Sequence, residues 1–313
     1  MLGKTAGGLY WMFRFLERSE NTARLVEAGF RIALTRSSDP VSEWKSVVTT
    51  AGVRTSYDKK HDSYSAANVV DFLLRDPSNP SSVISAIENA RLNARMVRIA
   101  LTTEVWEAVN ESWMGLKIAL KKPVKETELP AILGEIRRNN ALVRGALHGT
   151  MMRNDNYDFT QIGTALERAD NTARIIDVKY FTLLPTASFV GSALDNVQWE
   201  TILRSVSAHR SFRWLYNDEK SPASVAEFLI LDPRFPRSLS YCSKSLGANL
   251  NFLAKDYGTR MPCHDLIDAQ RDKLRRHTIE TIFEEGLHQF INTFIRENNA
   301  IGQQIEQDYR FIS

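Results

Sequence analysis

The feature that most constrains the fold is a nine-residue segment that occurs twice. Residues 16–24 read LERSENTAR and residues 166–174 read LERADNTAR, 150 positions later. Further matches follow in the same order at a spacing of 155 or 156, namely Trp44 with Trp199, Asp76-Pro77 with Asp232-Pro233, Ser82 with Ser238 and Asn93 with Asn249. A period this long indicates a duplicated half rather than a solenoid unit of roughly 20–50 residues. We therefore predict two copies of one module, residues 1–149 and 150–313, packed as one globular unit.

The periodicity of apolar residues is helical. Around the first segment they recur at intervals of three and four, at Leu9, Met12, Leu16, Ala23, Val26 and Phe30. Capping and breaking residues divide the chain into predicted helices at 6–35, 42–50, 82–101, 106–117 and 132–148, with a helical tail at 265–309. For the third helix we expect Asn79 as N-cap and Pro80 in the first turn. The predicted fold class is all-α, a helical bundle formed by two pseudo-symmetric copies of one multi-helix module.

The composition limits the classes of partner. Hydrophobic residues make up 43% of the 313 residues, enough for a large core. Lys and Arg number 40 against 37 Asp and Glu, and a net charge of +3 argues against nucleic acid or a membrane surface as the main partner. The chain has two cysteines, no export signal and no run of about 18 apolar residues that would span a membrane. We expect a soluble cytoplasmic protein.

One helical stripe of the repeated segment carries a carboxylate, an amide and a guanidinium in each copy. Its members are Glu17, Asn21, Arg24, Glu167, Asn171 and Arg174. Spacings of four and three let these side chains touch, and apolar residues flank the stripe on both sides. Because an unpaired buried charge costs several kcal/mol, we interpret the stripe as a structural polar seam between the copies, with a ligand site as the alternative. Arg18 and Arg168 point off the stripe, toward another helix or solvent.

A row of arginines occurs in the first copy only. Arg91, Arg95 and Arg98 share one helical stripe, and guanidiniums in such a row suit phosphate or carboxylate groups. The matching positions of the second copy hold no arginine, so the shared fold does not explain the row. With Arg153 these residues form a candidate anion site. The alternative is a solvated surface stripe paired with Glu88.

Motifs of known catalytic chemistry are missing from the sequence. Gly7-Gly8 lacks the spacing of a phosphate-binding loop, and no nucleophile elbow occurs. Glu285 and His288 have the Glu-x-x-His spacing of di-iron bundles, but the motif occurs once, and Cys263-His264 is equally isolated. We predict no metal and no cofactor, and the catalytic residues, if any, stay unknown.

Several other motifs occur in a fixed order along almost the whole chain. They are AGGLYW at 6–11, RFLER at 14–18, NPSS at 79–82, ARLNAR at 90–95, EVW at 104–106, TMMR at 150–153, ERAD at 167–170 and FPRS at 235–238. Together they resemble the alpha-E family of bacterial proteins, a helical domain of unknown function named for a Glu-Arg motif. The resemblance implies that the protein is encoded beside, or fused to, a circularly permuted ATP-grasp protein, often with a transglutaminase-like peptidase. Such a system would make or modify peptides through amide bonds.

Three hypotheses about function follow. The leading one is a non-catalytic accessory or substrate-presenting partner of an ATP-grasp amide ligase, with the transglutaminase-like peptidase as a further partner. The alternative is an enzyme or binding protein with a cleft for an anionic peptide or phosphorylated intermediate, lined by Glu17, Arg18, Glu167, Arg168, Arg91, Arg95 and Arg98. The third is a structural dimerisation module. A homo-oligomer is compatible with all three.

Overall fold

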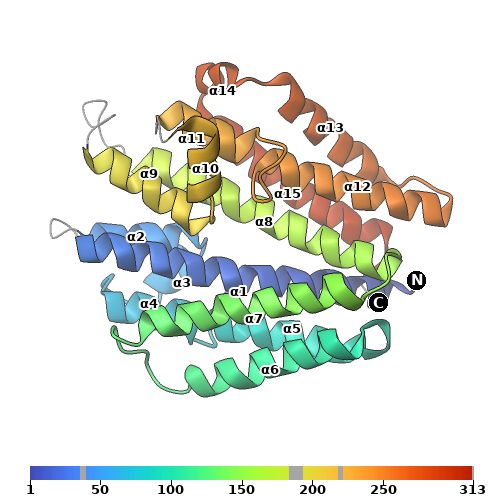
Figure 1. Ribbon diagram of the computed structural model, residues 1–313, viewed down its shortest axis with the longest axis horizontal. Helices are drawn as coiled ribbons and strands as arrows, with labels where there is room; N and C mark the ends of the chain where they lie inside the picture. Colours follow the sequence, from blue (N-terminus) through green and yellow to red (C-terminus); the bar gives the residue numbers. More distant parts are fainter. Residues whose placement is uncertain (36–39, 183–192, 218–220, 312–313) are drawn as a thin grey trace.

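The computed structural model describes residues 1–35, 40–182, 193–217 and 221–311 (Figure 1). Within these ranges the chain forms helices and no strand, so the predicted all-α class is confirmed. The α-helices are α1 (Gly3–Thr35), α2 (Pro40–Thr50), α3 (Arg54–Asp58), α4 (Ala66–Leu74), α5 (Val83–Met96), α6 (Thr103–Ala119), α7 (Leu129–Thr150), α8 (Asp155–Thr182), α9 (Ala193–Ser205), α10 (His209–Tyr216), α11 (Pro222–Ile230), α12 (Leu239–Tyr257), α13 (Pro262–Arg276), α14 (Ile279–Glu285) and α15 (Leu287–Asp308). A 3₁₀ turn, η1 (Arg98–Ala100), follows α5. None of the described helices is both long enough and apolar enough to cross a membrane.

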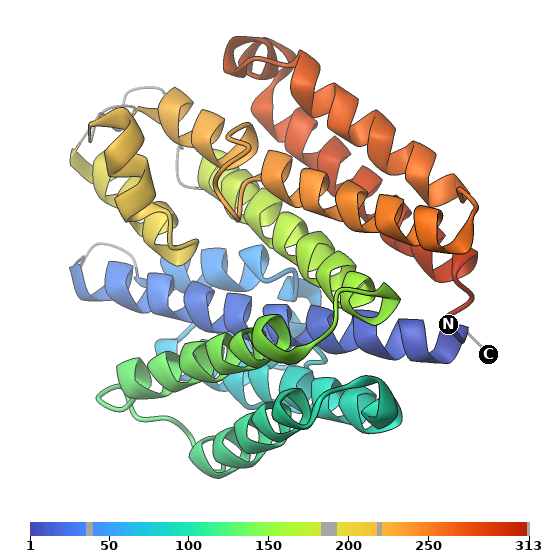
Figure 2. The ribbon, with the colours of Figure 1, turned by 45° about the vertical axis from the view of Figure 1, so that its right-hand side comes forward.

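The helices form two layers that meet at α1 and α8 (Figures 1 and 2). In Figure 1 the segment from α1 to α7 fills the lower half and the segment from α8 to α15 fills the upper half. Helix α1 packs against α5 and α7, and α8 packs against α12 and α15. The two long helices also pack against each other, and together they form the central spine of the molecule. Helix α6 contacts both α5 and α7, as α13 contacts both α12 and α15.

The two spine helices approach each other closely at a glycine. A Cβ atom at Gly163 would lie 2.3 Å from the carbonyl oxygen of Tyr10, far inside contact distance. Tyr10 itself is fully buried, and its ring contacts Phe311 with 5.1 Å between centroids. The two ends of the chain therefore lie together at one end of the spine (Figure 1).

The predicted cap of α5 is wrong. The N-cap is Ser82, whose Oγ accepts a hydrogen bond of 3.3 Å from the backbone N–H three residues on. Asn79 instead closes the preceding turn, because its Oδ1 accepts from the backbone N–H of Ser81 at 3.0 Å. Pro80 lies in that turn and not in the helix. The serine satisfies a first-turn amide that the helix itself leaves free.

Two predicted helices extend further than the observed ones. The helix predicted to reach residue 101 ends at Met96 and continues as η1. The tail predicted as helical over 265–309 consists of α13, α14 and α15, with breaks at His277 and at Gly286, whose φ is 94°. The predicted copy boundary at 149/150 lies at the C-terminal end of α7, and the division into two copies stays a prediction.

Candidate functional site

The two repeated segments face each other where α1 crosses α8, and their charged residues pair reciprocally. Arg168 donates hydrogen bonds to Glu17 from Nε (3.0 Å) and Nη2 (2.9 Å). Arg18 donates to Glu167 from Nε (2.6 Å) and Nη2 (3.0 Å). Each Glu-Arg dipeptide therefore supplies the carboxylate for the arginine of the other, through two-bond contacts of the strong kind.

Two further arginines join this cluster, and neither was among the predicted site residues. Arg14 Nε donates to Glu167 at 2.9 Å, and Arg237 Nη1 donates to Glu17 at 2.6 Å. Arg237 occupies the position that matches Ser81 in the first half of the sequence. In the sequence, the replacement of the first serine of NPSS by arginine in the matching motif FPRS was the one sign that could have pointed to Arg237.

The clustered carboxylates are almost inaccessible to solvent, since Glu17 is 2% and Glu167 is 6% exposed. Burial opposes the ionisation of Glu17, but Arg168 and its neighbouring arginines outweigh burial and hold the pKa of Glu17 well below its usual range. The same balance, with Arg18 as the first neighbour, lowers the pKa of Glu167 to about 2. Both carboxylates are therefore charged at neutral pH and fully paired.

Three other members of the predicted seam, Arg24, Arg174 and Asn21, find partners beyond their own stripe. Arg24 Nη2 donates to Glu20 at 2.6 Å, and Arg174 Nε donates to Asp170 at 2.7 Å. Asn21 Oδ1 accepts at 3.2 Å from an arginine that precedes α12. The polar residues of the repeated segments thus lie between α1 and α8. Arg24 and Arg174 pair with the carboxylate four residues earlier on the same helix, and Asn21 pairs with a distant part of the chain.

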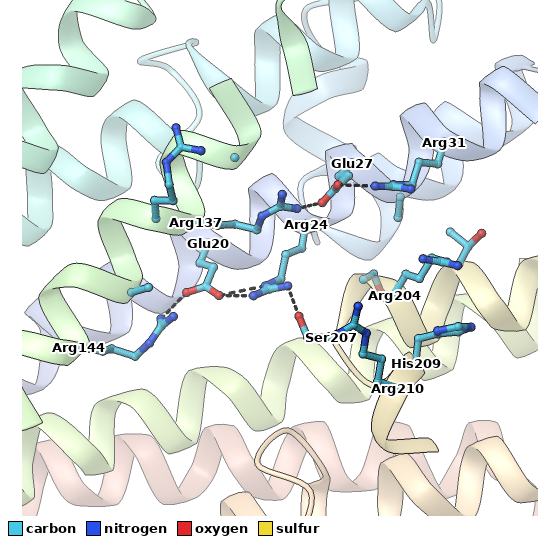
Figure 3. Close-up of a pocket in the computed structure, with 16 residues that line it drawn as sticks. Glu20, Arg24, Glu27, Arg31, Arg137, Arg144, Arg204, Ser207, His209 and Arg210 are labelled. Carbon is cyan, nitrogen blue, oxygen red and sulfur yellow. Dashed lines mark hydrogen bonds and ion pairs between the residues drawn. The ribbon is translucent and has the colours of Figure 1, made fainter. Parts of the chain in front are cut away.

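An opening lies beside this network, where the two layers meet (Figure 3). This opening, which we call the arginine pocket, has a volume of about 600 Å³ and lies between α1, α7, α9 and α10. Its charged walls consist of seven arginines, two glutamates and a histidine, namely Arg24, Arg31, Arg137, Arg138, Arg144, Arg204, Arg210, Glu20, Glu27 and His209. The positive charge concentrated here exceeds the net charge of the whole chain, which is +3.

The two glutamates hold only part of these arginines (Figure 3). The ion pairs are Arg24–Glu20, Arg144–Glu20, Arg31–Glu27 and Arg137–Glu27. Arg138, Arg204 and Arg210 are exposed. Arg204 donates to Glu200 at 2.9 Å, whereas Arg138 and Arg210 form no ion pair with any residue that the structure describes. Two guanidiniums at the opening are therefore available for an anion.

The arginines in the pocket wall lie close enough to one another to change a pKa. Burial, followed by the charges of Arg24 and Arg138, lowers the pKa of Arg137. Arg24 also donates to Ser207 at 2.5 Å, which ties α1 to the turn before α10. An anion bound among these guanidiniums would reduce their mutual repulsion.

The predicted arginine row lies elsewhere in the molecule. The guanidinium of Arg91 lies 4.1 Å from the ring centroid of Trp113, and that of Arg98 lies 5.4 Å from the ring centroid of Trp106. Both contacts are of the cation–π type and hold the two side chains against α6. Arg95 is exposed. None of the three lines the arginine pocket, and their role in anion binding stays a prediction.

Arg153 is separate from both groups. Its guanidinium lies 4.1 Å from the ring centroid of Tyr157, and its Nη1 donates to the carbonyl oxygen of Met151 at 2.7 Å. These contacts hold the turn between α7 and α8, and Arg153 does not line the arginine pocket. Its predicted role in an anion site is likewise untested.

Most arginines of the pocket are not evident from the sequence. Arg137 and Arg144 are seven positions apart on α7, the same spacing that separates Arg91 from Arg98 in the predicted arginine row. Arg204 and Arg210 belong to α9 and α10, and no sequence spacing relates them to α7. Only tertiary packing brings the four together.

Comparison with known proteins identifies the family. The chain matches a family described as a predicted alpha-helical domain with a conserved ER motif, and the match covers residues 1–310. Similar curated proteins include an uncharacterized protein of Mycobacterium bovis, 25% identical over 300 residues, and one of Mycobacterium tuberculosis strain H37Rv, 24% identical over 300 residues.

The aligned region covers 89% of this chain but 33% of each relative, so the chain spans about a third of the length of these relatives. No solved structure matches. The sequence contains two Glu-Arg dipeptides, at 17–18 and 167–168, and they are the ones that pair across the spine. This chain belongs to the Alpha-E family.

Proposed function

We propose that this protein binds a multiply charged anion in the arginine pocket. The observation that carries the proposal is the composition of the walls, seven arginines against two glutamates around about 600 Å³. Guanidiniums bind carboxylates and phosphates through paired hydrogen bonds. The volume also lies within the roughly 300–1,000 Å³ of small-ligand sites. The ligand class is an anionic peptide or a phosphorylated intermediate.

In this proposal the Glu-Arg pairs support the pocket and do not contact the ligand. Glu17 and Glu167 are buried and already held by arginines. Glu20 and Arg24 come from the same stretch of α1 and line the pocket. The Glu-Arg pairs therefore hold this part of the pocket wall in position. Ligand contact is assigned to the arginines at the opening, above all Arg210.

A thermal-shift series tests anion binding. Pyrophosphate, citrate and a glutamate-rich peptide are each added to the protein, with potassium chloride at equal ionic strength as the control. Because a ligand that binds only the folded state stabilises it by about 2.7 kcal/mol at a hundredfold excess over Kd, at least one anion should raise the Tm by several degrees. If no anion raises the Tm more than the chloride control does, the proposal is wrong.

We also propose that the protein acts in the cytoplasm as a non-catalytic partner of an ATP-grasp amide ligase, with a transglutaminase-like peptidase as a further component. The length of the relatives favours this second function. The aligned region makes up 33% of each mycobacterial protein, as expected of a module that works next to other domains. The arginine pocket would then present an anionic peptide, or a phosphorylated intermediate of its activation, to the ligase.

Affinity purification from the native cell tests the partnership. A tagged copy of the chain should recover an ATP-grasp ligase in washes at stringent salt. Recovery of the tagged chain without any ligase would contradict the partnership and leave the anion-binding proposal standing on its own test.

A further inference from the structure

A guanidinium fills a slot beside the first repeated segment. Arg237 Nη1 donates to Glu17 Oε1 at 2.6 Å and to Asn21 Oδ1 at 3.2 Å. Its Nη2 donates to Glu20 Oε1 at 3.1 Å. The side chain of Arg237 is buried, so two carboxylates and an amide oxygen of α1 define a complete binding site for one guanidinium.

The matching slot beside the second repeated segment is a cavity. The residues 150 positions after those three acceptors are Glu167, Asp170 and Asn171, and all three line a cavity of about 230 Å³. The cavity lies between α1, α8 and the end of α2. The residue that matches Arg237 is Ser81, which also lines the cavity but is too short to fill it. We call this cavity the serine pocket.

An amide in the wall of the serine pocket has no partner. Asn171 is 9% exposed, and its Nδ2 is buried without a hydrogen bond. In the matching residue, Asn21, the Nδ2 is likewise buried without a hydrogen bond, but the Oδ1 accepts from Arg237. Buried amides are nearly always paired, and the assignment of O and N in such an amide follows its hydrogen bonds. The Oδ1 of Asn171 accepts no hydrogen bond from a described residue, so it can accept from a cation as the Oδ1 of Asn21 does.

The number of guanidiniums around the two segments also differs by one. Two carboxylates of the first segment share four guanidiniums, those of Arg24, Arg144, Arg168 and Arg237. Among the described residues, the two carboxylates of the second segment share three, those of Arg14, Arg18 and Arg174. The match of Arg237 with Ser81 places the missing guanidinium in the serine pocket, where Arg18 and Arg174 already pair with Glu167 and Asp170 as Arg168 and Arg24 pair with Glu17 and Glu20.

We infer that the serine pocket binds a guanidinium group supplied from outside the chain, seated against Glu167, Asp170 and Asn171 as Arg237 is seated against the first segment. The group comes either from free arginine or from an arginine side chain of a peptide. The inference does not rest on the anion-binding proposal, because no residue lines both pockets.

Calorimetric titration of the full chain tests the inference with L-arginine, L-citrulline and the capped tripeptide Gly-Arg-Gly. Citrulline has the shape of arginine without its charge, so arginine should bind at least tenfold more tightly. Tighter binding of the tripeptide identifies a peptide side chain as the source, and tighter binding of L-arginine identifies the free amino acid. Equal binding of arginine and citrulline, or no binding of any of the three, would overturn the inference.

A substitution provides the second test. Ser81→Arg places the chain's own guanidinium where Arg237 lies in the matching slot, so it should reduce arginine affinity at least tenfold. Ser63→Arg adds the same charge at an exposed position outside the pocket and should leave affinity unchanged. Retained affinity in folded Ser81→Arg would overturn the inference. If this variant does not fold, the comparison of arginine with citrulline on the natural chain decides.

Discussion

Glu17 lies buried at the crossing of α1 and α8, where it accepts hydrogen bonds from Arg168 and Arg237. These arginines come from distant parts of the chain, and each is itself largely shielded from water. Taking away one member of such a cluster leaves the opposite charges buried and unpaired, which costs more than the pair contributes. The stability of the spine therefore depends on single side chains at this crossing.

Glu17→Gln should lower the free energy of unfolding by about 3–5 kcal/mol, because Arg168 and Arg237 keep their charges in a buried place. Urea denaturation at pH 7 measures the loss. Asp272→Asn is the control, since it removes an exposed carboxylate that pairs with Arg275 at 3.4 Å and should cost less than about 1 kcal/mol. Similar small losses in both variants would contradict the structural role of the buried pair.

Asp158 gives a pH dependence of opposite sign to that of the paired carboxylates. Burial, followed by repulsion from Asp256 and Asp155, raises the pKa of Asp158 to about 7. A raised folded-state pKa means that stability is fully present below the unfolded pKa of about 3.9 and is lost as the pH rises through 7. Asp158→Asn mimics the protonated form, so it should raise the Tm at pH 8 by about 2 °C or more and leave the Tm at pH 4 unchanged.

Thermal unfolding at both pH values measures this effect, with Asp62→Asn at an exposed position as the control. The control should change the Tm little at either pH. An equal change at pH 4 and pH 8 in Asp158→Asn would show that the carboxyl is not the group that titrates.

The identities of the central charged residues were predictable from the sequence, but their partners were not. Helical spacing placed Glu17 and Glu167 on polar stripes of two repeated segments. Arg237 and Arg14 contact these glutamates from 220 and 153 positions away in the chain. No local spacing encodes such a pairing, because it depends on how whole helices cross.

Helix ends depend on side-chain caps and on glycines. The close crossing of α1 and α8 depends on the absence of a side chain at Gly163. The long helices α1, α6 and α7 were predictable within a few residues because their apolar periodicity is strong. The end of α5 and the breaks on both sides of α14 were not. Gly286, with a φ of 94°, ends α14 in a conformation that the helical pattern of the tail does not reveal.

Gly163→Ala tests the close crossing of α1 and α8. The added methyl group would meet the carbonyl oxygen of Tyr10 at 2.3 Å, so the helices must separate and stability should fall by about 1–3 kcal/mol or more. Gly145→Ala is a matched control in another helix, where a Cβ meets nothing within 4 Å and should stabilise by up to about 1 kcal/mol. Chemical denaturation of both variants gives the comparison. A neutral or stabilising Gly163→Ala would contradict the tight crossing.

In the whole molecule, the arginine pocket forms where α1 and α7 of one layer meet α9 and α10 of the other. The sequence predicted two copies of a helical module, and the similar packing around α1 and α8 supports the proposal that they arose by duplication. The pocket itself could not be predicted, because its arginines come from four helices that only the tertiary fold brings together.

Calorimetric titration of pyrophosphate tests most directly whether the arginine pocket binds anions. Arg138→Ser/Arg210→Ser removes two exposed guanidiniums of the pocket, and Arg275→Ser/Arg276→Ser removes two exposed guanidiniums of α13 as a control of equal charge. The first pair should weaken binding at least tenfold, which corresponds to about 1.4 kcal/mol, and the control pair should change it little. Equal weakening in both double variants, or no binding to the natural chain, would contradict an anion site in the arginine pocket.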